Sequence, residues 1–156
     1  MSIKNGNCRC SKSRINPNIK KRISERKQCP ARRGKLLPTE TRCVCRSEFA
    51  GLKAQQGEFI EGSVYDNCQF GTGFGYTAPG LNFQALLLQS VTCLLNNTMT
   101  AIGIGKLSGR FVDFEIVLTR NPNTINLRVF KCQETFIHTV FRGSEVARIS
   151  LICCPR

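Results

Sequence analysis

The chain contains no tryptophan and a single histidine, His138, among its 156 residues. The missing tryptophan removes the usual core marker of an immunoglobulin-like sandwich. A Ser-His-Asp or Cys-His catalytic site would have to use His138, and the sequence has no Gly-x-Ser-x-Gly nucleophile elbow. We therefore expect no catalytic residues, and we interpret the chain as a protein that is not an enzyme.

Long apolar runs are also missing. No stretch approaches the roughly 18 consecutive apolar residues that cross a membrane, and the longest apolar piece, residues 85–95, is interrupted by Gln89, Ser90 and Thr92. The N-terminus is polar and lacks the apolar core of a secretory signal peptide. We expect a chain without a membrane span that is made in the cytoplasm.

The ten cysteines include no C-x-x-C pair, the spacing that zinc sites commonly use. The glycine-rich stretch 71–80 lacks the Lys-Ser/Thr of a P-loop and the spacing of a dinucleotide-binding loop. We expect no metal and no cofactor, although Cys29 with Cys43 and Cys45 could form an irregular metal site. Without a signal peptide, the thiols stay reduced in the cytosol, bind metal, or are oxidised later, for instance after the cell lyses.

Positive charge is concentrated at one end of the chain. Residues 1–46 hold 14 Lys and Arg against 2 Glu, whereas residues 47–156 hold 9 Lys and Arg against 8 acidic residues. We interpret residues 1–46 as a basic arm, extended or disordered alone, that contacts a polyanion such as nucleic acid. Residues 47–156 form the predicted folded domain. The candidate polyanion-binding residues are Lys12, Arg14, Lys20, Lys21, Arg22, Arg26, Lys27, Arg32, Arg33 and Lys35.

Alternating apolar and polar side chains predict β-strands through the last two thirds of the chain, as where Val112 and Phe114 alternate with Asp113 and Glu115. We predict strands at residues 58–66, 83–95, 99–107, 111–118, 124–130, 135–141 and 145–154, with a loop at 68–80. This spacing favours an all-β fold, an antiparallel jelly-roll or Greek-key sandwich of seven or eight strands. An immunoglobulin-like sandwich is the alternative.

The cysteine pattern suggests covalent links. Residues i and i+2 of an extended chain project to the same side, so both thiols of Cys8-Arg9-Cys10 can bond one strand of another element or subunit. Cys153 and Cys154 project to opposite faces, and can serve one internal and one external bond. The connectivity of ten cysteines cannot be deduced from sequence, and Cys93, Cys132 and Cys153 could equally be small buried hydrophobes. The other disulfide candidates are Cys29, Cys43, Cys45, Cys68, Cys93 and Cys153.

This layout resembles the subunits of pilus-like appendages on bacterial endospores, which are single jelly-roll domains with a cysteine-bearing N-terminal connector. Cys8-Arg9-Cys10 looks like such a connector, residues 149–154 look like a terminal cysteine strand, and residues 120–130 are similar to sheet strands of spore-surface proteins. The basic stretch 12–46 departs from the family. The resemblance implies a self-assembling fibre or spore-surface protein whose partners are its own copies, and which reaches the surface when the mother cell lyses.

On this interpretation, Cys8 and Cys10 form disulfides with a neighbouring subunit. An extended arm of more than thirty residues can reach a neighbour, because it spans about 3.3–3.6 Å per residue. The expected acceptor is Cys154, which the strand parity directs away from the core, and Cys132 is the second choice.

A second interpretation comes from another class of protein. A small jelly-roll behind a basic arm resembles the coat proteins of small icosahedral RNA viruses, notably satellite viruses, and residues 147–156 are similar to the tail of such a coat. The arm would then neutralise packaged RNA by releasing its counterions, and the protein would end in a virion. A third interpretation is a cytosolic nucleic-acid-binding accessory or metal-binding module.

Overall fold

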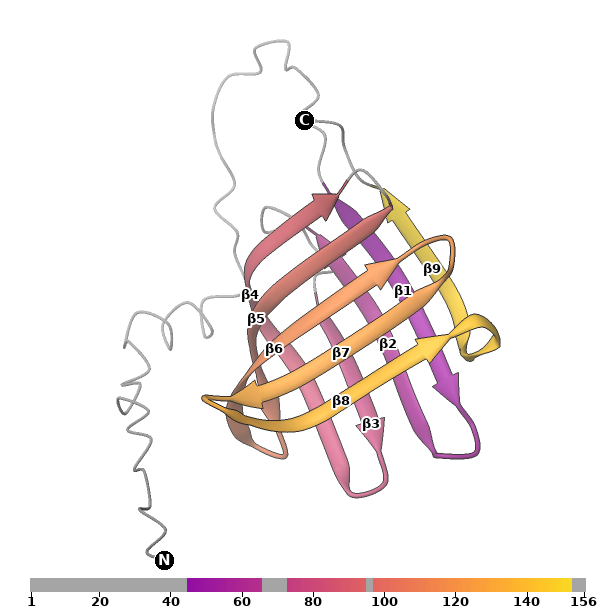
Figure 1. Cartoon of the computed structure of the whole chain (residues 1–156). Coiled ribbons are helices and arrows are strands. Elements are labelled where there is room, and N and C mark those ends of the chain that lie inside the picture. The colour runs from indigo at the N-terminus through magenta and orange to yellow at the C-terminus, as the bar shows by residue number, and fades with distance from the viewer. Residues whose placement is uncertain (1–44, 66–72, 95–96, 153–156) are drawn as a thin grey trace, which may run out of the picture. The chain divides into compact units, whose positions relative to one another are not determined.

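The computed structural model describes residues 45–65, 73–94 and 97–152, which form nine β-strands and one short 3-10 turn (Figure 1). The strands are β1 (Arg46–Lys53), β2 (Glu58–Tyr65), β3 (Gly73–Ala78), β4 (Leu81–Leu94), β5 (Thr98–Leu107), β6 (Arg110–Thr119), β7 (Thr124–Lys131), β8 (Glu134–Arg142) and β9 (Val146–Ile152), with η1 (Gly143–Glu145) between β8 and β9. The predicted all-β, antiparallel class is confirmed. None of the described residues forms a helix with the length and apolar character needed to cross a membrane.

All nine strands belong to one antiparallel sheet. From β1 to β8, strands that follow one another in sequence are hydrogen-bonded neighbours (Figure 1). β9 instead returns to the first strand, where Ile152 lies opposite Arg46 and Leu151 opposite Ser47. The strand order therefore ends at β8 on one side and at β9 on the other.

The jelly-roll topology expected from the sequence is not confirmed, because the strand order is a meander. A Greek key needs a long connection that carries one strand past its neighbours. Here β1–β2, β3–β4, β5–β6, β6–β7 and β7–β8 are joined by turns of only two to four residues. Turns this short can only connect adjacent antiparallel strands.

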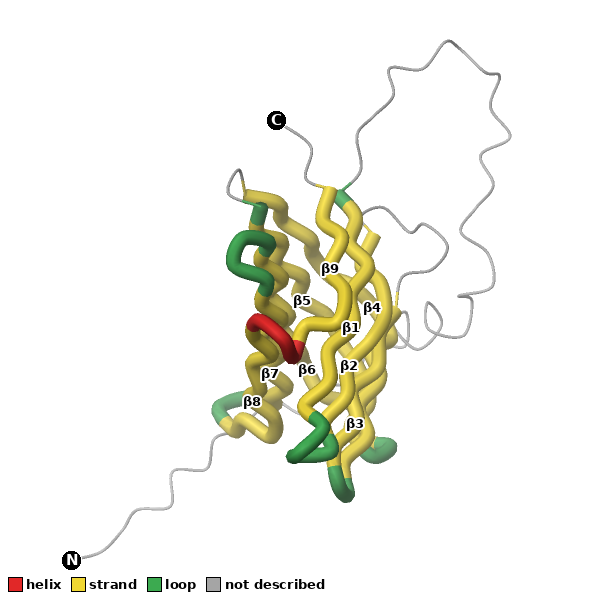
Figure 2. Tube along the Cα trace, turned by 90° about the vertical axis from the view of Figure 1, so that its right-hand side faces the viewer, coloured by secondary structure: helices red, strands yellow, loops and turns green. Residues whose placement is uncertain are grey.

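The sheet curls on itself and is nearly barrel-shaped, with β6, β7 and β8 facing β9, β1 and β2 across the core (Figure 2). Four phenylalanine rings occupy this core: Phe49, Phe74, Phe83 and Phe114, with ring centroids 5.1 to 5.8 Å apart. Most of these contacts are edge-to-face, the arrangement that the charge distribution of aromatic rings favours. Because the rings come from β1, β3, β4 and β6, they tie the two sides of the curled sheet together.

Glycines make room for these rings on β5. Gly103 and Gly105 face the core, whereas Ile102 and Ile104 point outward. A Cβ atom at Gly103 would lie 2.1 Å from the backbone oxygen of Leu87 and 2.8 Å from the Phe114 ring. The Phe114 ring therefore packs directly against the backbone of β5, and only glycine leaves room for this contact.

The predicted strands at 58–66, 83–95, 99–107, 111–118, 124–130 and 135–141 are confirmed to within a few residues as β2 and β4 to β8. β4 also has irregular register near Ala85 and Leu88, which fits a long strand with bulges. The last prediction, 145–154, is confirmed for the described portion as β9. Two strands were missed: β1, and β3, which lies inside the predicted loop 68–80.

Candidate functional site

Most of the predicted site residues lie outside the described residues. These are Cys8, Cys10, Cys29, Cys43, Cys68, Cys153 and Cys154, together with all ten predicted polyanion-binding residues from Lys12 to Lys35. The intersubunit links and the polyanion contact therefore stay predictions. The described part contains three of the ten cysteines, Cys45, Cys93 and Cys132.

Cys45 and Cys93 are both half-buried and pack against the core. Cys45 directly precedes β1, and the sulfur of Cys93, near the end of β4, lies 3.9 Å from the carbonyl oxygen of Ile152 at the end of β9. The structure therefore places Cys93 at the end of the sheet where β1 begins and β9 ends.

Cys132 has a different environment from the other two. It is exposed in the two-residue turn between β7 and β8, with a φ of 57°. This is not the buried position considered for it in the sequence analysis. The turn leads directly into β8, one end of the strand order, so Cys132 lies beside a sheet edge.

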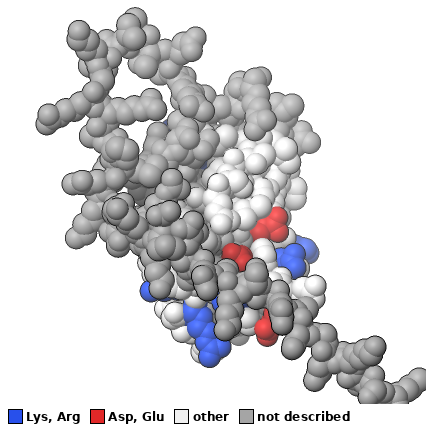
Figure 3. Space-filling model, turned by 90° about the vertical axis from the view of Figure 1, so that its left-hand side faces the viewer, with Lys and Arg blue, Asp and Glu red and all other residues white. Residues whose placement is uncertain are grey.

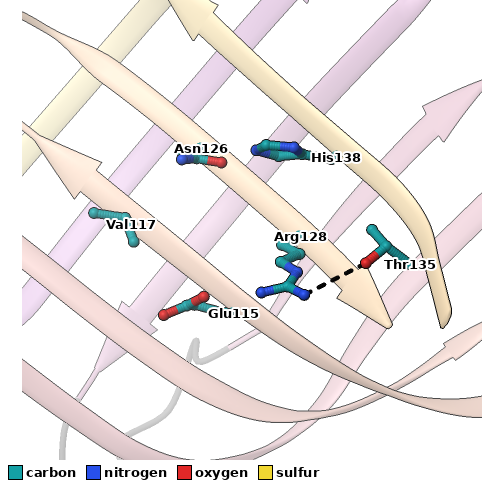
Figure 4. A pocket seen from close by; sticks show the side chains of 6 residues that line it. All are labelled: Glu115, Val117, Asn126, Arg128, Thr135 and His138. Atoms are coloured by element: carbon teal, nitrogen blue, oxygen red, sulfur yellow. Dashed lines mark hydrogen bonds between the residues drawn. The ribbon is translucent and has the colours of Figure 1, made fainter. Parts of the chain in front are cut away.

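A depression of about 440 Å³ lies on the outer face of β6, β7 and β8 (Figure 4). It is lined by Glu115, Val117, Asn126, Arg128, Thr135 and His138. Three of these residues form a row across β6, β7 and β8, because Glu115 lies opposite Arg128 and Arg128 lies opposite His138. The Arg128 guanidinium stacks 5.1 Å from the Phe130 ring centroid and donates a long hydrogen bond of 3.5 Å to Thr135. The depression thus presents donors and acceptors for a polar contact.

His138 is exposed in this depression, and Figure 4 shows its ring beside Asn126. His138 is therefore a surface residue rather than a core residue. Among residues 45–65, 73–94 and 97–152, no three His, Cys, Asp or Glu side chains come together in a way that could hold a metal ion.

The second polar site lies inside the curled sheet and was missed by the sequence analysis. The Lys53 ammonium donates hydrogen bonds of 2.6 Å to Thr139 and 3.2 Å to Glu58, and the Thr139 hydroxyl donates one of 2.5 Å to the same Glu58 oxygen. Lys53 also lies 4.9 Å from the centroid of the Phe141 ring. These contacts join the β1–β2 hairpin to β8, although β8 is not a hydrogen-bonded neighbour of either strand. We refer to Lys53, Glu58, Tyr76 and Thr139 as the internal polar cluster.

Charge and burial in the internal polar cluster alter two pKa values. Burial alone would raise the pKa of Glu58, but hydrogen bonds from Thr139 and Lys53 and the positive charge of Lys53 outweigh it and lower the pKa. Burial, followed by the negative charge of Glu58 and a hydrogen bond to it, raises the pKa of Tyr76 to about 12. Glu58 is thus held ionised and Tyr76 neutral at pH 7, which keeps the Lys53–Glu58 ion pair intact.

Local sequence carries little signal for the internal polar cluster. Lys53 and Glu58 flank a turn, where charged residues are ordinarily exposed, yet only 13% and 18% of their side-chain surfaces are accessible. Thr139 is 86 residues from Lys53 in sequence. Its inward position on β8, between Ile137 and Phe141, is the one indication that a polar group enters the core.

Comparison of the chain with protein-family models, with curated proteins and with solved structures found no match.

Proposed function

We propose that this chain is a structural protein that assembles with copies of itself, as a spore-surface or appendage-type subunit that disulfides cross-link through its N-terminal arm. The observation that carries the proposal is the pair of sheet edges. Among the described strands, β8 and β9 each have a hydrogen-bonded neighbour on one side only. Such an edge presents backbone N–H and C=O groups to which an extended segment of another chain can add as a strand.

Both edges lie next to cysteines along the chain. Cys132 is exposed in the turn that precedes β8, and β9 runs to Ile152, directly before Cys153 and Cys154 in sequence. An arm laid along the β9 edge would bring its own cysteines toward the end of the chain that carries Cys153 and Cys154. Ile152 at the end of β9 is 38% exposed, and Cys154, the acceptor expected from the sequence, lies outside the described residues.

The length of the arm supports an intersubunit link. More than thirty residues separate Cys10 from Cys45, and an extended segment of that length spans about 100 Å at roughly 3.3 Å per residue. The thiols would remain reduced in the cytoplasm and pair after cell lysis, which explains a cysteine-rich chain that is made in the cytoplasm and ends on a surface.

The test of this proposal is electrophoresis of the full chain in denaturant, with and without reductant. After oxidation, we expect wild type to give a ladder of covalent multimers that collapses to monomer on reduction. The Cys8→Ser, Cys10→Ser double variant should lose the ladder, because neither arm thiol can reach a neighbour. The control is Cys29→Ser, in the same arm, which should retain it. A wild type without multimers, or an unchanged ladder in the double variant, contradicts the proposal.

A second candidate is a capsid-like shell protein whose basic arm binds RNA, and the charge distribution favours it. Nearly all of the formal charge of +13 lies in residues 1–46. On the uncovered part of the face in Figure 3, by contrast, Lys and Arg occur together with Asp and Glu. We therefore assign polyanion binding to the arm, whose cations would release counterions from the RNA.

This candidate predicts salt-dependent binding of single-stranded RNA by the arm. Replacing five arm cations with Gln should reduce the slope of log K against log salt by about 0.7 for each phosphate that the arm no longer neutralises. The arm variant changes Lys20, Lys21, Arg22, Arg26 and Lys27. A charge-matched control changes five exposed residues of the folded domain, Arg110, Arg120, Lys131, Arg142 and Arg148. Equal slopes for the two variants, or RNA binding that is insensitive to salt, would rule out the arm as the RNA site.

A further inference from the structure

β8 ends one side of the strand order, and its outer backbone edge has no partner among the described strands (Figure 1). Two hydrogen bonds at the end of β8 show which way its backbone groups point. The N–H of Gly143 donates to the carbonyl oxygen of Asn123, at the end of β7's side of the ladder. The N–H of Arg142 instead donates to the Glu145 carboxylate at 2.9 Å. Successive residues thus point their N–H groups to opposite sides.

The same alternation continues back along β8. The register with β7 is uninterrupted from Arg142 to Ile137, and pairs that exchange hydrogen bonds alternate with pairs that do not in an antiparallel ladder. Because Gly143 faces β7, so do the odd-numbered residues from 137 to 141. His138 and Val140 therefore direct their N–H and C=O groups to the outer edge, where no described strand receives them.

The composition of β8 leaves this edge unguarded. Natural edge strands are commonly protected by Lys, Pro or an inward-pointing charge, and β8 has none of these between its two ends. A register shift against β7 limits the regular edge to residues 137–142, and Phe136 beside it is 40% exposed. The opposite edge differs, because Arg148 places a charge in the middle of β9. β8 is therefore the edge better suited to accept another strand.

The two ends of β8 carry opposite charges. Glu134 begins the strand and Arg142 ends it, and both side chains are exposed. Among the described residues, the ion pair joins Lys53 to Glu58, so neither end charge of β8 is paired there. If a second β8 runs antiparallel, the acidic end of each strand meets the basic end of the other. A parallel copy would bring like charges together, so the strand complements itself in one orientation only.

We propose that β8 pairs antiparallel with β8 of a second copy of this chain, about a two-fold axis near Thr139, so that the two sheets become continuous. His138 of each copy then exchanges both backbone hydrogen bonds with Val140 of the other. Glu134 of each copy lies diagonally from Arg142 of the other, within reach of its long side chain. The contact is isologous, because the same surface serves both copies.

This pairing deepens the proposed self-assembly by naming a contact between copies that uses neither the arm nor its cysteines. A two-fold contact closes after two copies. A fibre therefore needs a different contact between such dimers, which the arm links would supply. The β8 pairing and the arm links are separate contacts, and each can fail without the other.

Sedimentation of the full chain in excess reductant tests the pairing, because no disulfide then holds copies together. We expect wild type to dimerise reversibly as its concentration rises. Glu134→Lys and Arg142→Glu each turn both end contacts into like-charge contacts, and each should raise the dissociation constant about tenfold. The matched controls, Glu61→Lys on β2 and Arg110→Glu on β6, change the same charges at exposed sites. They should leave the dissociation constant within about twofold, because distant exposed charges are screened.

Two combinations identify the orientation. The double variant Glu134→Lys, Arg142→Glu restores opposite charges at both ends and should dimerise about as tightly as wild type. An equimolar mixture of the two single variants should form heterodimers, since each end of the pair then joins opposite charges. The proposal is overturned if wild type stays monomeric in reductant, if the single variants dimerise as well as the controls, or if the double variant is as weak as the single ones.

Hydrogen exchange, resolved by residue with NMR, reports the backbone bonds directly. Raising the concentration of the full chain in reductant should slow exchange of the His138 and Val140 amide hydrogens, and Glu134→Lys should reduce this slowing. The amide hydrogens of Thr139 and Phe141, which face β7, should be protected at every concentration. Exchange at His138 and Val140 that ignores concentration would contradict the pairing. A dimer in reductant without covalent multimers after oxidation would reject the arm links alone, and multimers without the dimer would reject the β8 pairing alone.

Discussion

Gly103→Ala is expected to destabilise the protein by about 3 kcal/mol or more, at the upper end of what overpacking a core costs. The added methyl group would lie 2.1 Å from the backbone oxygen of Leu87 and within 3 Å of two atoms of the Phe114 ring. The ring could shift, but the Leu87 oxygen belongs to the neighbouring strand and moves only with the sheet. The substitution should therefore disturb both the β4–β5 pairing and the aromatic core.

Gly75→Ala is the matched control, because Gly75 also lies within a strand of the same sheet. There the nearest atom to an added Cβ is the backbone oxygen of Phe83 at 3.7 Å, an ordinary contact. We expect a change within about 1 kcal/mol, of either sign, since Ala also restricts the unfolded chain. Urea unfolding followed by circular dichroism measures both free energies. Equal free energies of unfolding for the two variants would contradict the close packing described for β5.

Lys53→Met is expected to cost about 2–4 kcal/mol at pH 7, somewhat below the full cost of breaking a completely buried ion pair. The substitution leaves the Glu58 carboxylate in a largely buried position without its counter-charge. Lys53→Met combined with Glu58→Gln should recover much of the loss, because no unpaired charge then remains. Lys106→Met is the control: Lys106 is exposed and lies over the Phe111 ring, so a change of about 0.5 kcal/mol or less is expected.

The same variant should show a defined pH dependence. Because the pKa of Glu58 is lowered in the folded protein, its contribution to stability is present above its unfolded pKa and is lost as pH falls through the folded pKa. The difference in unfolding free energy between wild type and Lys53→Met should therefore be largest where Glu58 is ionised in both proteins, and it should shrink in more acidic solution as Glu58 is protonated. A difference that stays constant from pH 7 to below the folded pKa would show that Lys53 acts by packing alone.

The alternation of apolar and polar residues was sufficient to predict those strands that have large apolar side chains at their inward positions. On β6, Val112, Phe114, Ile116 and Leu118 are all buried, and the strand was found. β1 was missed because Ser47, Gly51 and Lys53 occupy inward positions and hide the pattern. β3 was missed because glycines alternate with its two inward aromatic residues, a composition typical of loops.

Topology and the internal polar cluster could not be predicted in the same way. The pairing of β9 with β1 joins residues about a hundred positions apart, and alternation within a strand does not specify its neighbour. The turns did contain the information for a meander, since two-residue connections such as Ser108–Gly109 allow only adjacent strands. The internal polar cluster depends on the curl of the sheet, which brings β8 to the β1–β2 hairpin, and no local pattern encodes that approach.

The most direct test of assembly through the arm is to map disulfides in a mixture of light and ¹⁵N-labelled full chains that are oxidised together. Trypsin releases Cys8 in peptide 5–9 and Cys10 in peptide 10–12. We predict that these peptides are linked to peptide 149–156, or to the Cys132 peptide 132–142, and that mixed-isotope pairs are as abundant as the two single-isotope pairs together. Arm peptides that occur only as alkylated thiols, or only in single-isotope pairs, would contradict the account, because the arm would then join no second subunit.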